Sequence, residues 1–239
     1  MVLAPKIIFY DESLLVLNKP SGWIVNESQT TKGIDNVVQT WLKSNYKYNI
    51  VKNRELRSGI VHRLDKETSG ILVVAKTLYS FNNLQMQFKD RIVKKTYLAL
   101  LHGKLEPSVG EINVPVGRLP WNRRRFGVLP GGRESKTKYK VISYYSDNSQ
   151  IYSFLEFYPE TGRTHQIRIH AKYLGHSIVS DEFYAGRKTA KKDRSICPRL
   201  FLHSYRIEFI HPVSNTLIKF VSNIPSDLNR VLKNFKKLD

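Results

Sequence analysis

The most constraining feature of this sequence is a short apolar segment, Ile71–Ala75, that closely follows a charged tetrapeptide. The segment is rich in β-branched residues and is bounded by Gly70 and a lysine, which is typical of a buried strand. The Thr-Ser-Gly triplet before it favours a turn. The tetrapeptide His-Arg-Leu-Asp, residues 62–65, is therefore expected on a loop that a core strand holds in place. Such a loop suits a carboxylate that must be rigid and yet reachable by a large substrate.

Three interpretations of Asp65 are open on this pattern alone. In the first, the carboxylate has a structural role and pairs with Arg63 or caps the turn. This is the usual role of a single Asp, because functional sites are few in any protein. In the second, Asp65 is a catalytic residue on a rigid loop. In the third, Asp65 and His62 form the acid/base pair of a hydrolase, but the sequence shows no activated nucleophile to accompany them.

The charge balance of the chain favours a polyanionic partner. Its 239 residues include 39 Lys and Arg against 20 Asp and Glu, which gives a formal net charge of +19. Nucleic acid is the first candidate for such a partner. A membrane surface is the alternative, but the sequence has no long apolar span and no basic amphipathic helix with a broad apolar face. We therefore expect a nucleic-acid partner and no membrane.

Length and composition predict one domain over residues 1–239. The hydrophobic content of 41% is sufficient for a packed core. A single cysteine, Cys197, excludes an internal disulfide and a cysteine-rich zinc site. The first residues lack the apolar core of a signal peptide. We expect a cytoplasmic monomer that binds no metal.

The hydrophobic pattern predicts an α+β fold with mostly antiparallel strands. Apolar residues recur at helical spacing over 34–42, 78–88 and 227–237. Thr164 is expected to cap a further helix that runs to about Leu174. Short apolar or alternating runs predict strands over residues 7–10, 14–17, 71–75, 93–101, 136–144, 151–158, 200–209 and 220–221.

Two segments concentrate the positive charge. Residues 116–140 contain eight Lys and Arg against the single Glu134, with glycines and Trp121 between them. A run of like charge is usually a solvated face, but cations interleaved with an aromatic ring are also typical of a surface that follows RNA phosphates. We expect this segment to be a basic loop whose RNA contacts include Arg123, Arg124 and Arg125. Residues 187–199 form a second basic loop.

The sequence around Asp65 resembles the catalytic motif of the RluA-type RNA pseudouridine synthases. His-Arg-Leu-Asp followed by Thr-Ser-Gly-Ile-Leu-Val matches that motif, in which the Asp is the essential residue. Residues 161–170, which read Thr-Gly-Arg-Thr-His-Gln-Ile-Arg-Ile-His, are similar to a second motif of the family. Weaker matches extend from about Ile7 to Leu232. Many members of the family carry a small RNA-binding module ahead of this region, and we expect no such separate N-terminal module here. One departure is Asn26-Glu27, where the family usually has a His-Pro pair.

The resemblance implies the pseudouridine synthase fold, a mixed and mostly antiparallel sheet with flanking helices and a central catalytic cleft. It also implies that Asp65 is catalytic and that Arg168 pairs with it. Tyr97, within the family pattern Lys-x-Tyr-x-Ala, would stack on the target base, although a tyrosine in an apolar strand is by itself usually a core residue.

Three further residues are expected to contact the RNA. Leu202 and Ile167 would form the apolar wall of the pocket, which raises the cost of admitting water. Arg63 would contact a phosphate or the vacated stack while the base is flipped out. His62 is expected to be structural.

The activity that the resemblance implies is the isomerisation of uridine to pseudouridine in RNA. This reaction needs no cofactor, and the sequence contains no dinucleotide, Walker or zinc-deaminase motif. The expected substrate is large-subunit ribosomal RNA, and transfer RNA is the alternative. A catalytically inactive RNA-binding protein of the same fold would use the positive charge alone.

Overall fold

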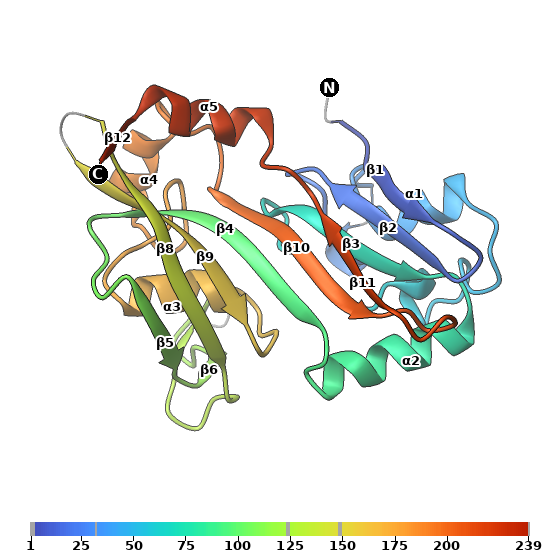
Figure 1. The fold of residues 1–239 in the computed structure, drawn as a ribbon. Coiled ribbons are helices and arrows are strands. Elements are labelled where there is room, and N and C mark those ends of the chain that lie inside the picture. Colours follow the sequence, from blue (N-terminus) through green and yellow to red (C-terminus); the bar gives the residue numbers. More distant parts are fainter. Residues whose placement is uncertain (1–2, 32, 123–124, 148–149, 239) are drawn as a thin grey trace. The chain divides into compact units, whose positions relative to one another are not determined.

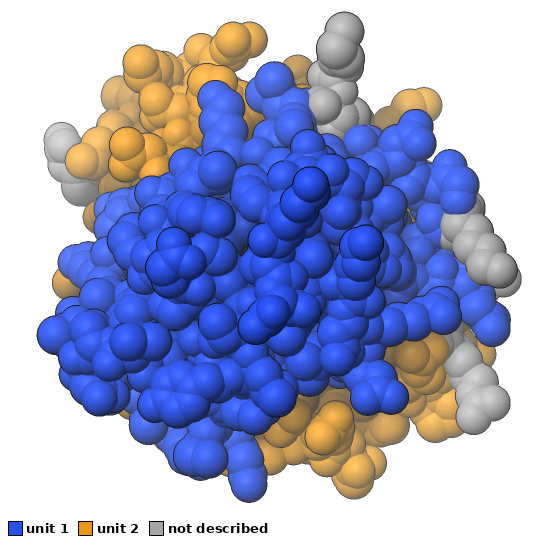
Figure 2. Space-filling model, turned by 90° about the vertical axis from the view of Figure 1, so that its right-hand side faces the viewer, with its two compact units in different colours: residues 1–94, 204–222 blue, residues 95–203, 223–239 orange. Residues whose placement is uncertain are grey.

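The computed structural model of the chain describes residues 3–31, 33–122, 125–147 and 150–238. The chain divides into two compact units, which are coloured separately in Figure 2. Unit 1 comprises Met1–Lys94 and Ser204–Ser222, and unit 2 comprises Lys95–His203 and Asn223–Asp239. Each unit is therefore built from two separate stretches of the chain.

Unit 1 is organised around a mostly antiparallel set of strands (Figure 1). Its strands follow the order β1 (Lys6–Tyr10), β2 (Leu14–Lys19), β3 (Ser69–Ala75) and β10 (Leu202–Ile210), and β11 (Leu217–Val221) also pairs with β10. The expected hairpin β1–β2 closes at Asp11, whose Oδ1 accepts the backbone N–H groups of Ser13 and Leu14. Every residue of β3 is buried, which confirms the core strand that the apolar segment predicted.

Within its described residues, unit 1 has two α-helices, α1 (Val38–Asn45) and α2 (Leu78–Lys89). Helix α2 packs against β3, and Thr77 caps it by accepting the Ser80 N–H. Helix α1 begins four residues later than the expected 34–42. Val37 forms a parallel bridge with Ile24 and is held extended, so the helix starts only after it.

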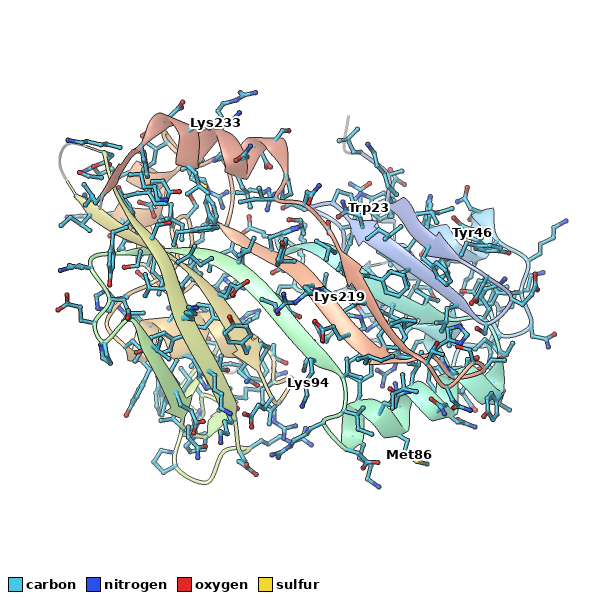
Figure 3. The ribbon with its side chains drawn as sticks, in the orientation of Figure 1. Trp23, Tyr46, Met86, Lys94, Lys219 and Lys233 are labelled. Atoms are coloured by element: carbon cyan, nitrogen blue, oxygen red, sulfur yellow. The ribbon has the colours of Figure 1, made fainter. Side chains whose placement is uncertain are left out.

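A row of aromatic rings connects α1 to the sheet. Trp23 packs edge-on against Trp41, Trp41 against Tyr46, and Tyr46 stacks on Tyr10 with 6.5 Å between ring centroids. Figure 3 labels Trp23 and Tyr46 on this side of unit 1. Aromatic pairs of this kind add to the burial of apolar area and fix the loop between β2 and α1.

Unit 2 contains a further set of antiparallel strands. Its strands follow the order β4 (Lys94–His102), β9 (Ile151–Pro159), β8 (Lys136–Ser146) and β12 (Lys236–Leu238), and β5 (Val109–Asn113) pairs with β8 as well. The short strands β6 (Val116–Arg118) and β7 (Phe126–Val128) form a separate pair. The expected basic loop over 116–140 is therefore wrong in part, because it contains this pair, whereas the strand expected from residue 136 is observed as β8.

The part of unit 2 that the structure describes has three α-helices, α3 (Gln166–Tyr173), α4 (Arg187–Asp193) and α5 (Ser226–Asn234). The basic segment 187–199, expected as a loop, begins with α4. The terminal helix was expected to run to residue 237 but ends at Asn234. Phe235 is extended and stacks on Tyr152 with 4.9 Å between ring centroids, and β12 follows it as a partner of β8. This strand pairing provides hydrogen-bond partners for backbone groups at the edge of β8, which a longer helix would not pair with.

Candidate active site

Asp65 lies in unit 1 on the loop that leads into β3. The residues on either side of it anchor this loop, because Leu64 and Thr68 are buried whereas Asp65 is only partly buried. The Thr68 N–H donates to the Asp65 carbonyl over 3.2 Å and closes a turn. The loop therefore presents the carboxylate from a fixed backbone, as the sequence predicted.

A buried lysine fastens this loop to the β2 end of the sheet. Lys19 is fully buried, and its Nζ donates to the carbonyl oxygens of Pro20, Trp23 and Lys66 over 2.9 to 3.2 Å. The Lys66 carbonyl also accepts the Gly22 N–H. A buried ammonium group is stable only with such partners. Lys19 thus places a positive charge against the residue that follows Asp65.

Sequence reasoning missed Lys19, which stands in the Asn-Lys-Pro-Ser-Gly stretch directly after the expected strand 14–17. The one available signal was its position at the end of an apolar strand. Two of the carbonyl groups that bind it, on Pro20 and Trp23, are close in sequence, whereas the Lys66 carbonyl reaches it only in the folded unit.

His62 is structural, as expected. Its Nε2 accepts the Val73 N–H of β3 over 2.9 Å, and its ring packs on Phe88 with 5.1 Å between ring centroids. A nitrogen that accepts a backbone hydrogen bond cannot act as a general base. This contact argues against a hydrolase that uses His62 and Asp65. Arg63, between them, has an exposed side chain.

Gly70 allows β3 to begin beside Ser204. Its φ is +111°, and a Cβ placed on it would lie 2.2 Å from the Ser204 carbonyl oxygen. Only glycine fits such a close approach of two backbones. The glycine between the Asp65 loop and the core strand is therefore a packing requirement.

Arg168 lies in unit 2 on α3 and forms a buried pair with Asp181. Its Nε and Nη2 each donate to one carboxylate oxygen of Asp181 over 2.8 Å. The side chains are 4% and 0% exposed. This is the bidentate geometry that a guanidinium group provides and a lysine does not.

Asp181 also organises the turn that follows it. Its Oδ1 accepts the N–H groups of Phe183 and Tyr184 over 3.0 and 3.1 Å. The rings of these two residues face the Arg168 guanidinium, with 5.2 Å from its Cζ to each ring centroid. One carboxylate and two aromatic rings thus fix the direction of Arg168. Sequence reasoning missed this role of Asp181, although the segment around it was part of the resemblance.

The start of α3 differs from the expectation, since Thr164 does not cap the helix. His165 occupies the capping position with a left-handed φ of 56° and makes no side-chain cap. The Gln166 side chain ties this end to β8 instead, because its Nε2 donates to the Lys136 carbonyl and to Thr137 Oγ1. Gln166 Oε1 accepts the Thr161 hydroxyl. The backbone that carries Arg168 is therefore anchored to a core strand.

The remaining expected site residues have the following places. Tyr97 of β4, Ile167 of α3 and Leu202 at the start of β10 are buried residues of unit 2. Arg125 is exposed in unit 2. Arg123 and Arg124 lie outside the described residues.

Asp65 belongs to unit 1, whereas Arg168, Tyr97, Ile167 and Leu202 belong to unit 2. The pairing of Asp65 with Arg168 remains a prediction. A guanidinium group has two edges, so the bond to Asp181 through Nε and Nη2 is compatible with a second carboxylate at the other edge.

Neither a metal site nor a membrane-spanning helix is found among the described residues. They contain no group of three His, Cys, Asp or Glu side chains arranged to hold a metal ion. None of the helices in the described ranges has the length and apolar character needed to cross a bilayer.

The chain is similar to known proteins over almost its whole length. Residues 13–173 match the family model described as RNA pseudouridylate synthase. The ribosomal large subunit pseudouridine synthase D of Nitrosomonas europaea is 36% identical over 98% of this chain and 66% of its own length. An uncharacterized RNA pseudouridine synthase of Synechocystis is 35% identical over 95% of this chain and 67% of its own length. The chain thus spans about two thirds of these curated relatives.

The fold is similar to that of a solved human protein. Human RNA pseudouridylate synthase domain containing 1 superimposes with a TM-score of 0.76 at 26% identity, covering 98% of this chain and 89% of the human one. The expected fold, an α+β arrangement with a mostly antiparallel sheet, is confirmed by this likeness.

Proposed function

Because this chain belongs to the RNA pseudouridine synthase family, we propose that it isomerises uridine to pseudouridine in RNA with Asp65 as its catalytic carboxylate. The observation that carries this proposal is the Asp65 loop. Asp65 lies between two buried anchors, Leu64 and Thr68, and Lys19 fastens the next residue. A carboxylate held in this way meets the demand of catalysis for fixed geometry.

The reaction breaks the bond between uracil N1 and the ribose, turns the base, and joins carbon 5 to the ribose. A proton leaves carbon 5 and one is taken up at N1, so that no electrons are gained or lost overall. Asp65 would act by attacking the anomeric carbon, by attacking carbon 6 of the base, or by removing a ribose proton. All three require the ionised carboxylate. A cationic group near it favours that form, and Arg168 is the proposed partner.

The other site residues would receive the flipped base. Tyr97 would stack on the uracil, and Ile167 and Leu202 would exclude water from it. Arg63, exposed beside Asp65, would contact the RNA backbone while the base leaves its stack. The burial of the first three supports a pocket wall.

Large-subunit ribosomal RNA is the proposed substrate. Support comes from relatives whose printed name is ribosomal large subunit pseudouridine synthase D, including those of Nitrosomonas europaea and Borreliella burgdorferi. The net charge of +19 suits any large RNA. The net charge therefore does not distinguish ribosomal RNA from transfer RNA as the substrate.

Mapping of pseudouridines tests the activity and the substrate together. Carbodiimide modification and primer extension on ribosomal and transfer RNA should reveal a large-subunit site that is lost in cells lacking the protein and regained with the parent gene. If the only site lost were in transfer RNA, the assignment of ribosomal RNA as the substrate would be wrong. With RNA labelled with tritium at uracil carbon 5, the purified protein should release tritium, which an inactive RNA-binding protein does not do.

A further inference from the structure

Unit 2 contains a pocket that the proposed chemistry does not use. Its volume is about 420 Å³. Its walls combine cations, one aromatic ring and one acidic residue, namely Arg125, Glu182, Phe183, Arg187, Ala190, Lys191 and Arg194. The pocket therefore brings together the two basic segments of the sequence, which are far apart along the chain.

One face of α4 forms much of the wall. Arg187, Ala190, Lys191 and the C-cap residue Arg194 follow the spacing i, i+3, i+4, i+7, which places their side chains on one side of a helix. Lys188 and Lys192 are also exposed but do not line the pocket.

The pocket has an excess of positive charge. Glu182 is paired with Arg194 over 2.9 Å, so these two charges largely compensate each other. Within the described ranges, no acidic side chain is recorded within 4.0 Å of Arg125, Arg187 or Lys191. Three cations thus remain to bind an anionic ligand.

Phe183 adds a flat apolar surface to these cations. Its side chain is 43% exposed although it is a large aromatic group. Its ring also contacts the Arg168 guanidinium. An exposed ring beside several cations is the combination that binds single-stranded nucleic acid, in which the base stacks and the phosphates pair with the cations. An acidic protein would use the cations but would gain less from the ring.

We infer that this pocket binds a nucleotide of the RNA other than the target uridine. Its base would stack on Phe183, and its phosphates would be held by Arg187, Lys191 and Arg125. The inference rests on the proposed function, because it describes a second contact of the same RNA. The ring contact between Phe183 and Arg168 places this nucleotide close to the proposed catalytic arginine.

A salt titration of RNA binding tests the cationic part of the pocket. The probe is a fluorescein-labelled single-stranded oligouridylate, and affinity is measured against salt concentration. The double variant Arg187→Gln/Lys191→Gln should bind more weakly, and its salt slope should fall by roughly 1.4 if each side chain contacts one phosphate. The matched control Lys188→Gln/Lys192→Gln removes the same charge from the same helix and should lower the slope by much less. Equal losses in both variants would overturn the site.

Substitution of Phe183 tests the stacking part. Phe183→Ala should weaken binding by roughly tenfold, and Phe183→Tyr, which keeps an aromatic face, should bind like the parent. Alanine and tyrosine variants of equal affinity would overturn the base assignment. The base assignment would also be overturned if an oligoglutamate of equal charge competed for the pocket as effectively as RNA does, because the pocket would then recognise charge alone.

Tritium release measured on the same proteins separates this inference from the proposed function. If the parent forms pseudouridine but the pocket variants bind RNA normally, the pocket assignment fails and the enzyme assignment stands. If no pseudouridine forms but the pocket variants lose affinity as described, the enzyme assignment fails and the pocket stands.

Discussion

Replacement of Asp181 by asparagine should destabilise unit 2 strongly. The new side chain would keep one oxygen for the backbone N–H groups of Phe183 and Tyr184 but would turn an amide N–H₂ toward a guanidinium donor of Arg168. The pair is almost completely buried, with side chains 4% and 0% exposed. Removing one partner of a buried pair costs about 3–5 kcal/mol. We expect a loss near the lower end, about 3 kcal/mol, because part of the hydrogen bonding survives.

Urea unfolding followed by circular dichroism measures this loss, and hydrogen exchange of the α3 amides locates it in unit 2. The control is Glu182→Gln, which removes the neighbouring carboxylate from a partly exposed pair with Arg194. Such a pair contributes up to about 1 kcal/mol. If Asp181→Asn is no less stable than Glu182→Gln, the buried pair does not hold Arg168 as described.

The remaining predictions concern three other positions. Arg168→Lys should lose pseudouridine formation nearly as fully as Arg168→Ala, because one ammonium cannot reproduce two parallel hydrogen bonds; near-normal turnover of the lysine variant would mean that only charge is needed. Gly70→Ala should destabilise unit 1 by at least about 2 kcal/mol, since its Cβ would meet the Ser204 carbonyl oxygen. The control Gly33→Ala changes a glycine that also has a positive φ but has open space around it, and it should cost about 1 kcal/mol. Equal losses in the free energy of unfolding for the two variants would refute the close approach at Gly70. Burial lowers the pKa of His170 to about 4, and the nearby Val114 carbonyl offsets only part of this effect. As the pH falls, the unfolded chain therefore binds the extra proton before the folded chain does. The resulting stabilisation, up to about 3 kcal/mol, is complete above pH 6.5 and is lost as the pH falls toward 4. In urea unfolding, His170→Gln should show a weaker dependence of the free energy of unfolding on pH in this range, and the same dependence in variant and parent would contradict the prediction.

The local pattern of the sequence was sufficient for the elements that a single apolar segment defines. Strand β3 and helix α2 follow from five β-branched or apolar residues and from a helical repeat, and both are observed. The Asp65 loop was predictable for the same reason, because its position depends on the strand that follows it. The motif around it also identified the family.

Contacts between distant segments could not be predicted in the same way. The role of Lys19 was not predicted, because the Lys66 carbonyl that completes its set of partners lies 47 residues along the chain. The Arg168–Asp181 pair depends on a turn thirteen residues further along the chain. Strand β12 formed where a helix was expected because β8 offers it an edge. In each case the tertiary partner outweighs the local propensity.

The central claim is that Asp65 is the catalytic carboxylate, and Asp65→Asn tests it most directly. The measurement is tritium release from RNA labelled at uracil carbon 5, at saturating RNA, alongside circular dichroism and RNA affinity. Glu67→Gln is the matched control, since it removes the same charge from the same loop. We predict that Asp65→Asn folds and binds RNA like the parent but releases no tritium above background, while Glu67→Gln remains active. Turnover of Asp65→Asn within tenfold of the parent would contradict the assignment.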